Sequence, residues 1–265
     1  MSQASNGALH LIQCHPDARH LALWGHRNGL LRTAQETGFQ KDDPGYVFHA
    51  LLKAAFGALA PKPFWYRVGR EGLLAFTRHD PQSLRHSASL AIPDVCAALG
   101  LNPDASDLGL TSRRYPDRWA AGHRLAFETR ARPIVRSKPP EGRVAVAERD
   151  AFLAHLDRLP AESPADTPAT REVVYLEWLA GQLAREGAAQ LESARVVQYR
   201  LTSVLRQQGL REDGRRARSM VSGPEVVIAG TLRVSSTDAF AGLLTRGVGR
   251  HRAFGFGLIL LSPAG

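Results

Sequence analysis

The sequence predicts an α+β protein, and three observations along its 265 residues support this. Short runs such as Ala8–Cys14 and Glu225–Val234 are apolar or alternate between apolar and polar residues, as strands do. Other segments, such as Tyr46–Leu59, place apolar residues at helical spacing. The predicted order is β-α-β-β-(α) followed by β-α-β-β-α-β. This order fits two tandem ferredoxin-like (RRM-like) domains better than a doubly wound fold, in which strands and helices would alternate strictly.

The first half begins with the predicted strand Ala8–Cys14. A mixed polar and apolar segment, His15–Asp43, follows as a long loop in which Gly29–Glu36 is the expected helix. Asp43 directly before Pro44 is a helix-start signal, because Asp caps a helix and Pro fits its first turn. The sequence therefore predicts the first long helix from Tyr46 to Leu59.

Two strands are predicted next, Phe64–Val68 and Leu73–Thr77, joined by a hairpin turn of glycine and charged residues. The segments Asp80–Leu90 and Ile92–Leu99 are ambiguous between helix and strand. Residues Asn102–Gly122 are rich in Asp, Pro, Ser and Gly, which is typical of a linker. The expected domains are therefore residues 1–110 and 111–265.

The second half begins with a predicted strand in His123–Val135, and Arg149–Leu159 is a predicted short helix. Thr170 is expected to cap a strong helix, because apolar residues at helical spacing follow it as far as Leu183. Gly187 closes that segment, and Ala194–Tyr199 is a predicted strand. The last elements are expected at Glu225–Val234 (strand), Asp238–Arg246 (helix) and Phe256–Leu261 (strand).

The segment Leu201–Met220 lies between the predicted strands Ala194–Tyr199 and Glu225–Val234, and it is rich in arginine and poor in β-branched residues. The sequence predicts a basic helical insertion here, outside the core of the second domain. From Arg195 to Arg218 the chain carries seven arginines against only Glu212 and Asp213. A solvated basic helix without a ligand is the alternative, because runs of charge are commonly exposed faces.

The composition points to a polyanionic partner, with a net charge of +9 and a pI near 10.2. Only four of the 34 basic residues are lysines, so 30 are arginines. Arginine suits bidentate phosphate contacts and stacking on bases. Cys14 and Cys96 are too few for a disulfide framework. Without a signal peptide or a long apolar run, the protein is expected to be cytoplasmic, with no membrane partner.

The C-terminus carries two Gly-apolar-Gly units, Gly247-Val248-Gly249 and Gly255-Phe256-Gly257. Between them lie Arg250, His251 and Arg252, and an apolar run follows. Glycine allows positive φ and close approach of another backbone, so such a loop can present N–H groups and charge to an anion. A hairpin or bulge before the last strand is the alternative interpretation of the glycines alone.

Four segments together resemble the CRISPR repeat-processing endoribonucleases of the RAMP superfamily, of the CasE type found in type I-E Cascade or a type IV relative. The segments are Tyr46–His49, Phe64–Val68, Gly122–Pro133 with its G-x-R-L-x-F-x-x-R-A-x-P pattern, and the glycine-rich C-terminus. The resemblance implies two ferredoxin-like domains that hold RNA across them. It also implies metal-independent cleavage, in which the 2′-OH attacks the adjacent phosphate and leaves a 2′,3′-cyclic phosphate and a 5′-OH.

By the position of the family motif, His49 and Tyr46 are the implied catalytic residues, and their i, i+3 spacing places them on one helix face. His26 and Arg27 are the alternates. No metal or other cofactor is expected, because carboxylates do not cluster and no Cys/His group has zinc spacing. The expected RNA-binding residues are Arg32, Arg195, Arg200, Arg206, Arg211, Arg215, Arg216, Arg218, Arg246, Gly247, Gly249, Arg250, His251, Arg252, Gly255 and Gly257.

The chain departs from the family pattern in two places. The segment between the first strand and the first long helix is longer than usual, and the arginine-rich stretch looks helical where type I-E members carry a basic β-hairpin. The expected partners are a CRISPR repeat hairpin, the mature crRNA and other effector-complex subunits. A non-catalytic RAMP protein that scaffolds guide RNA and a general binder of structured RNA are the alternative functions.

Overall fold

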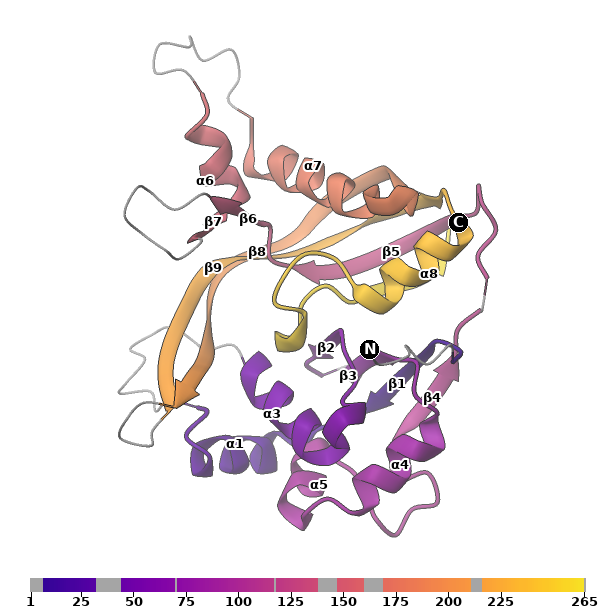
Figure 1. Ribbon diagram of the computed structural model, residues 1–265, viewed down its shortest axis with the longest axis vertical. Helices are drawn as coiled ribbons and strands as arrows, with labels where there is room; N and C mark the ends of the chain where they lie inside the picture. Colours follow the sequence, from indigo (N-terminus) through magenta and orange to yellow (C-terminus); the bar gives the residue numbers. More distant parts are fainter. Residues whose placement is uncertain are drawn as a thin grey trace.

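A computed structural model describes residues 7–31, 44–69, 71–116, 118–137, 147–159, 169–210 and 216–264. Figure 1 shows two halves, each a sheet covered by helices, stacked with the N-terminal half below. A long two-stranded ribbon leaves the upper half and runs down along one side of the lower half. The described helices include none that is long and apolar enough to cross a membrane.

The first half holds a four-stranded antiparallel sheet in the order β2-β3-β1-β4. Its strands are β1 (His10–Cys14), β2 (Phe64–Arg67), β3 (Gly72–Thr77) and β4 (Thr111–Arg114). Its helices are α1 (Ala18–Arg27), α3 (Gly45–Phe56), α4 (Pro81–Ser89) and α5 (Pro93–Leu99).

The second half repeats this arrangement with the strand order β10-β5-β9-β8. Its strands are β5 (Arg124–Ala131), β8 (Ala189–Leu210), β9 (Arg216–Val234) and β10 (Ile259–Pro263), and its main helices are α7 (Arg171–Leu183) and α8 (Thr237–Arg246). A smaller unit of β6 (Ile134–Ser137), β7 (Ala147–Asp150) and α6 (Ala151–Leu156) follows β5. In both sheets the fourth, first, third and second strands lie side by side, which is the ferredoxin-like order. The predicted tandem ferredoxin-like fold is therefore confirmed.

Helix α3 carries the residues that matter most for the site, and its two faces differ. Val47, Phe48, Leu51 and Leu52 are buried among the first half's helices and sheet, at the spacing of a helical apolar face. The helix ends at Gly57, whose φ of 55° lies in the left-handed region that favours glycine. The apolar face fixes the helix, and the opposite face is left for polar residues.

Strand β3 is buried on both sides and joins the two halves. Leu73 and Ala75 pack with the helices of the first half, whereas Leu74 and Phe76 belong to the core of the second half, together with Phe240 of α8. Alternate residues of a strand point to opposite faces, so one strand can serve two cores. The two halves consequently meet along a continuous apolar seam.

Several predicted elements are confirmed, including α3, β1, β2, β3, β5, α7 and α8. Thr170 does cap α7, since its side chain accepts a hydrogen bond from the N–H of Val173. The two ambiguous segments are helices α4 and α5, and each begins with a proline in its first turn. The helix expected in Arg149–Leu159 is shorter, because Arg149 and Asp150 belong to strand β7.

The predicted basic helical insertion at Leu201–Met220 is wrong, because the described part of this segment is strand. Strands β8 and β9 pair in antiparallel register far beyond the sheet, with Leu201 opposite Pro224 and Val204 opposite Val221. The arginine-rich composition gave no strong local preference, and pairing with a distant strand decided the conformation.

Two further expectations need correction. The segment after β1 contains helix α1, which begins at Ala18 after the cap Asp17 and was not predicted, whereas a helix was expected at Gly29–Glu36. Residues 29–31 are not helical, and 32–36 lie outside the described residues. The domain division expected at residue 110 falls before β4, which pairs with β1 in the first sheet. The change from one sheet to the other therefore lies between Arg114 and Arg124, because β4 completes the first half.

Candidate active site

A cleft of about 840 Å³ lies where the two halves meet. It is lined by α3, the segment between α3 and β2, the end of β3, strand β7 and the glycine-rich loop, residues 247–257. Its basic lining residues are Lys53, Lys62, Arg78, Arg246, Arg250 and Arg252, with His49, His79 and His251 as further titratable groups and Glu148 as an acidic residue. Such a concentration of positive charge in a concave site favours an anionic ligand.

His49 projects from the polar face of α3 into this cleft. Its ring lies 5.9 Å from that of Tyr46 and 5.6 Å from that of Phe254, measured between centroids. Burial, with Lys53 and Lys62 nearby, lowers the pKa of His49 below its usual value. The imidazole is therefore neutral near neutral pH and can accept a proton.

Three cations around His49 were not singled out by the sequence analysis. Lys53 lies one helical turn beyond His49 and lines the same cleft, so its i, i+4 spacing was an available signal. Lys62 follows α3, and Arg78 follows β3. Arg78 is held by hydrogen bonds to Thr245 Oγ1 at 3.0 Å and to the carbonyl of Gly7 at 2.9 Å. Local sequence patterns could not have predicted that Lys62 and Arg78 line this cleft, because tertiary packing places them there.

The glycine-rich loop is closed by hydrogen bonds within the protein. The N–H of Val248 donates to the carbonyl of Gly257 at 2.9 Å, and the N–H of Gly257 donates to the carbonyl of Arg130 at 2.7 Å. A Cβ on Gly257 would lie 2.2 Å from the oxygen of Val248, and a Cβ on Gly249 would lie 2.8 Å from Trp178. The close approaches that these glycines permit are therefore to protein atoms.

The basic side chains of this loop are held in place by acidic and carbonyl groups. Arg246 pairs with Glu186 at 2.9 Å, and Arg252 donates to the carbonyl of Arg246 at 2.7 Å. Burial, together with neighbouring arginines, lowers the pKa of Arg252 below its usual value. Arg250, His251 and Arg252 line the same cleft as His49.

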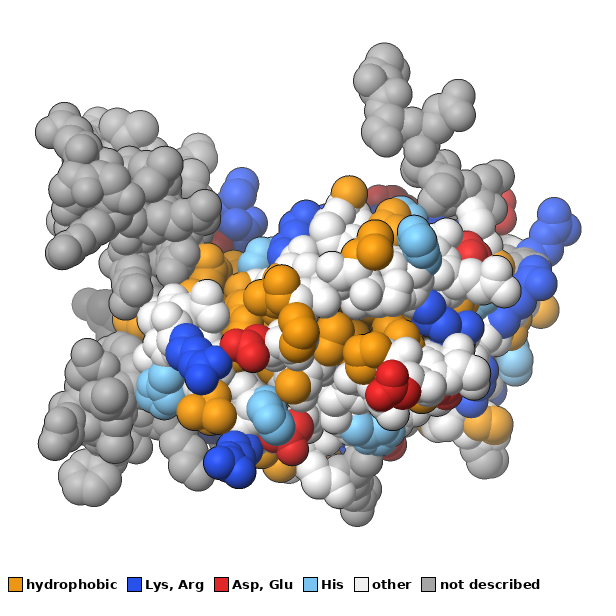
Figure 2. Space-filling model, turned by 90° about the horizontal axis from the view of Figure 1, so that it is seen from below, with side chains coloured by type: hydrophobic (Ala, Val, Ile, Leu, Met, Phe, Trp, Pro, Cys, Tyr) orange, Lys and Arg blue, Asp and Glu red, His pale blue; other side chains and the backbone are white. Residues whose placement is uncertain are grey.

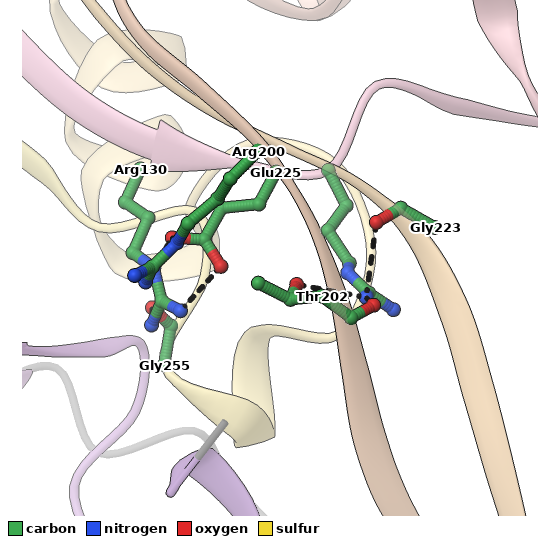
Figure 3. A network of polar contacts seen from close by, with 7 residues as sticks. Arg130, Arg200, Thr202, Gly223, Glu225 and Gly255 are labelled. Atoms are coloured by element: carbon green, nitrogen blue, oxygen red, sulfur yellow. Dashed lines mark hydrogen bonds and ion pairs between the residues drawn. The ribbon is translucent and has the colours of Figure 1, made fainter. Parts of the chain in front are cut away.

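A buried network connects the loop to the base of the ribbon (Figure 3). Arg130 of β5 binds both carboxylate oxygens of Glu225, at 2.9 and 2.7 Å, and its Nη1 donates to the carbonyl of Gly255 at 3.3 Å. Arg200 of β8 approaches the same carboxylate at 2.7 Å. The two arginines hold the pKa of Glu225 below its usual value against the effect of burial. The carboxylate thus ties β5, β8 and β9 together.

Arg132 fixes the next part of the ribbon, although it was not predicted as a functional residue. Its side chain is 1% exposed and donates to the backbone carbonyl of Thr202 at 2.5 Å and to its Oγ1 at 3.1 Å. The guanidinium groups of Arg130 and Arg132 lie 4.3 and 5.2 Å from the ring centre of Phe256. Phe256, the apolar residue of the second Gly-apolar-Gly unit, is therefore packed against both arginines.

The ribbon carries the other predicted RNA-binding arginines. Arg195 and Arg200 are exposed on β8, which passes α3 on its way out of the sheet (Figure 1). Arg206 lies on β8, and Arg216 and Arg218 on β9, so all three belong to the ribbon. Arg32, Arg211 and Arg215 lie outside the described residues.

The alternate residues His26 and Arg27 lie on α1 and do not line the cleft. Arg27 forms an exposed pair with Asp94 of α5 at 2.8 Å. Figure 2 views the molecule from below, on the side of these helices, and its described side chains show acidic and basic groups interspersed around an apolar band. The concentration of basic groups belongs to the cleft and not to this helical face.

The side chains of the described residues form no group of three or more His, Cys, Asp or Glu that could hold a metal ion.

Comparisons with known proteins bear on the whole chain. A family model described as "CRISPR associated protein" matches residues 9–263. No curated protein matches the chain. A structure of the CRISPR endoribonuclease Cse3 bound to a 19-nucleotide RNA is similar over 97% of this chain and 100% of that one, with 17% identity and a TM-score of 0.54. A second structure of that complex gives 17% identity, coverage of 97% and 99%, and a TM-score of 0.51.

A chain of a CRISPR RNA-guided surveillance complex in a pre-nicking state is similar over 97% of this chain and 100% of that one, with 17% identity and a TM-score of 0.52. At this identity the solved structures establish a shared fold, with two ferredoxin-like halves in the same order.

Proposed function

The chain belongs to the CRISPR-associated protein family, and on that premise we propose that it is an endoribonuclease that cleaves precursor crRNA at the base of the repeat hairpin. The observation that carries the proposal is His49, half-buried in a basic cleft between two ferredoxin-like halves. The fold it shares with the RNA-bound Cse3 structures supports RNA as the polyanion.

The proposed reaction needs no metal ion. The 2′-OH of the nucleotide attacks the adjacent phosphate, the new O–P bond replaces the bond to the 5′-oxygen, and a 2′,3′-cyclic phosphate and a 5′-OH remain. His49, neutral near pH 7, can accept the proton of the 2′-OH. Lys53 is close enough to His49 to lower its pKa and can stabilise charge that develops on the phosphate. Tyr46 packs against the rings of His49 and Phe254, and its hydroxyl can orient the RNA.

Binding is assigned to the ribbon and the glycine-rich loop. A-form RNA has a deep, narrow major groove that side chains cannot read, so charge and shape must hold the stem. The ribbon carries arginines on both of its strands, and the loop adds Arg250 and Arg252 at the cleft. We propose that the product stays bound as mature crRNA and that other effector-complex subunits assemble around it.

Incubation of the purified protein with its own repeat RNA tests the function. We expect one cut at the hairpin base, unaffected by EDTA, and a 5′-OH and a cyclic phosphate on the products. A 2′-deoxy substitution at the scissile nucleotide should stop cleavage without affecting binding, because it removes only the nucleophile. Tight, specific binding without any cleavage would favour the non-catalytic scaffold. Equal affinity for unrelated hairpins would favour a general binder of structured RNA.

A further inference from the structure

We propose that His251, oriented by Glu148, is a second catalytic residue of the cleft and acts as the general acid that protonates the leaving 5′-oxygen. The inference rests on the proposed ribonuclease function and extends it, because in-line displacement at phosphorus needs a proton acceptor at one side and a proton donor at the other. His49 takes the first role in this scheme.

The histidine and the carboxylate form a close pair. His251 Nε2 lies 2.7 Å from Glu148 Oε2, and its side chain is only 7% exposed, although both residues line the cleft. Glu148 lies on β7, more than 100 residues earlier in the chain, and its other oxygen lies 2.6 Å from Arg250 Nε. A carboxylate bound to one imidazole nitrogen fixes the orientation of the ring and leaves Nδ1 to face another partner.

The backbone at His251 is unusual in a way that supports a functional role. Its φ of 59° and ψ of 26° place a non-glycine residue in the left-handed region, between two glycine-rich units. Such conformations cost free energy and are concentrated at functional sites. In this conformation the imidazole contacts Glu148 at the wall of the cleft. A glycine would adopt the same backbone angles more easily, but it would not supply this side chain.

Both histidines lie next to the same aromatic ring. The ring of Phe254 is 5.6 Å from that of His49 and 6.0 Å from that of His251, between centroids. His49 comes from the first half and His251 from the second. A phosphodiester in the cleft can thus meet one imidazole from each half.

Charged groups on three segments act on His251. Glu148 of β7 raises its pKa, whereas Arg250 of the loop and Arg132 after β5 lower it, and burial lowers it most. The net pKa of His251 is below its usual value, so the protonated form is a stronger acid than an exposed imidazolium. Glu148 counteracts this decrease.

The complete step is balanced without a cofactor. His49 takes the proton of the 2′-OH as the O2′–P bond forms, and His251 gives a proton to O5′ as the P–O5′ bond breaks. Each histidine returns to its starting form by exchange with water. The pair with Glu148 also has a structural interpretation, as a clamp between β7 and the loop, and the experiment must separate the two.

An RNA with a bridging 5′-phosphorothiolate at the cut makes this separation, because a thiolate leaves without protonation. On ordinary RNA, His251→Gln should lose about 10²–10⁴-fold in single-turnover rate. Its amide can still donate to Glu148, so the clamp is retained. On the 5′-thio RNA, most of this loss should disappear for His251→Gln and should remain for His49→Ala. His86→Gln, an exposed histidine of α4, is the matched control and should behave as wild type on both substrates.

A pH–rate profile provides the second measurement. Glu148→Gln removes the group that raises the pKa of His251, so the descending high-pH limb should move to lower pH. The assignment would be overturned if His251→Gln lost the same factor in rate on ordinary RNA and on 5′-thio RNA. It would also be overturned if the 5′-thio RNA restored the rate of His49→Ala but not that of His251→Gln. An unmoved high-pH limb in Glu148→Gln would do the same. A wild-type protein that cuts neither RNA would instead refute the proposed function itself.

Discussion

The hairpins of the two halves occupy equivalent places in the same topology and have opposite character. In the first half, β2 and β3 span only 4 and 6 residues, and all six residues of β3 are buried. In the second half, β8 and β9 span 22 and 19 residues, extend far beyond the sheet and carry the exposed Arg195 and Arg200. The repeated fold therefore serves two purposes. The first half presents His49 at a rigid seam, whereas the second half reaches outward with charge.

The site also requires that the two halves keep a fixed position relative to each other. The cleft combines α3 from one half with the glycine-rich loop from the other, so its geometry depends on the seam. The Arg130–Glu225–Arg200 network stiffens the ribbon at the point where it leaves the sheet. If the first half supplies the chemistry and the ribbon supplies the binding, changes in the first half should affect the cleavage rate. Changes in the ribbon should then affect the affinity for RNA.

The largest effect is expected for His49→Ala. Loss of one acid–base group should reduce cleavage by about 10²–10⁴-fold. Hairpin affinity should remain nearly intact, since it comes from many phosphate contacts elsewhere. Tyr46→Phe should cost less, because it keeps the ring that packs on His49 and Phe254. Single-turnover rates and filter binding measure both quantities.

Full activity in His49→Ala would show that the first half does not contribute to catalysis through His49. It would direct attention to His26 and Arg27 on α1, which should then be changed to alanine. Loss of hairpin binding in the same variant would assign His49 a docking role instead.

Glu225→Gln should be the most destabilising change in the second half. It leaves the buried Arg130 charge without this carboxylate, and breaking a buried pair typically costs about 3–5 kcal/mol in the free energy of unfolding. Glu192→Gln is the matched control, because Glu192 pairs with the half-exposed Arg124 and Arg233, and surface pairs contribute about 0–1 kcal/mol. Chemical denaturation compares the two, and equal losses would show that the network does not stabilise the ribbon base.

The same network predicts a pH dependence. The folded-state pKa of Glu225 lies below its unfolded value, near 4.5, so its stabilisation is present above that pH and is lost as the pH falls towards the folded value. The stability difference between wild type and Glu225→Gln should therefore shrink on acidification. A difference that stays constant below pH 4.5 would contradict this.

Gly257→Ala should also destabilise the second half. Gly257 and Gly122 have φ of 82° and 83°, but a new Cβ meets the carbonyl oxygen of Val248 only at Gly257, whereas nothing lies within 4 Å at Gly122. Both variants incur the left-handed cost of about 1–2 kcal/mol. Gly257→Ala should lose roughly 1–3 kcal/mol more, as overpacking does. Equal melting temperatures would mean that the loop relaxes without cost.

The smallest effect per residue is expected in the arginine-rich stretch of the sequence. Replacing Arg211, Arg215 and Arg216 with alanine should weaken hairpin binding and flatten its salt dependence. Each lost phosphate contact should remove roughly 0.7–0.9 from the log–log slope. Arg19→Ala, at an exposed position of α1 in the first half, is the control and should leave the slope unchanged. A triple variant with the wild-type slope would place these arginines in solvent.

Local signals predicted much of this fold correctly because they depend on neighbours in the chain. Thr170 caps α7, and the apolar spacing from Val47 to Phe56 forms the buried face of α3. The i, i+3 spacing of Tyr46 and His49 does bring their rings together. The glycine-rich C-terminus was identified as a loop before a final strand, and its positive φ angles agree with that.

The sequence by itself determined most of the main strands and helices, the excess of positive charge and the helix that carries His49. Only the tertiary structure decided that residues 195–210 and 216–218 lie in a β-ribbon, because strand pairing outweighs a weak local preference. The convergence of Lys62, Arg78, Glu148 and His251 on one cleft is tertiary as well. These residues are distant in sequence, and they meet because Leu74 and Phe76 on one face of β3 join the core of the second half.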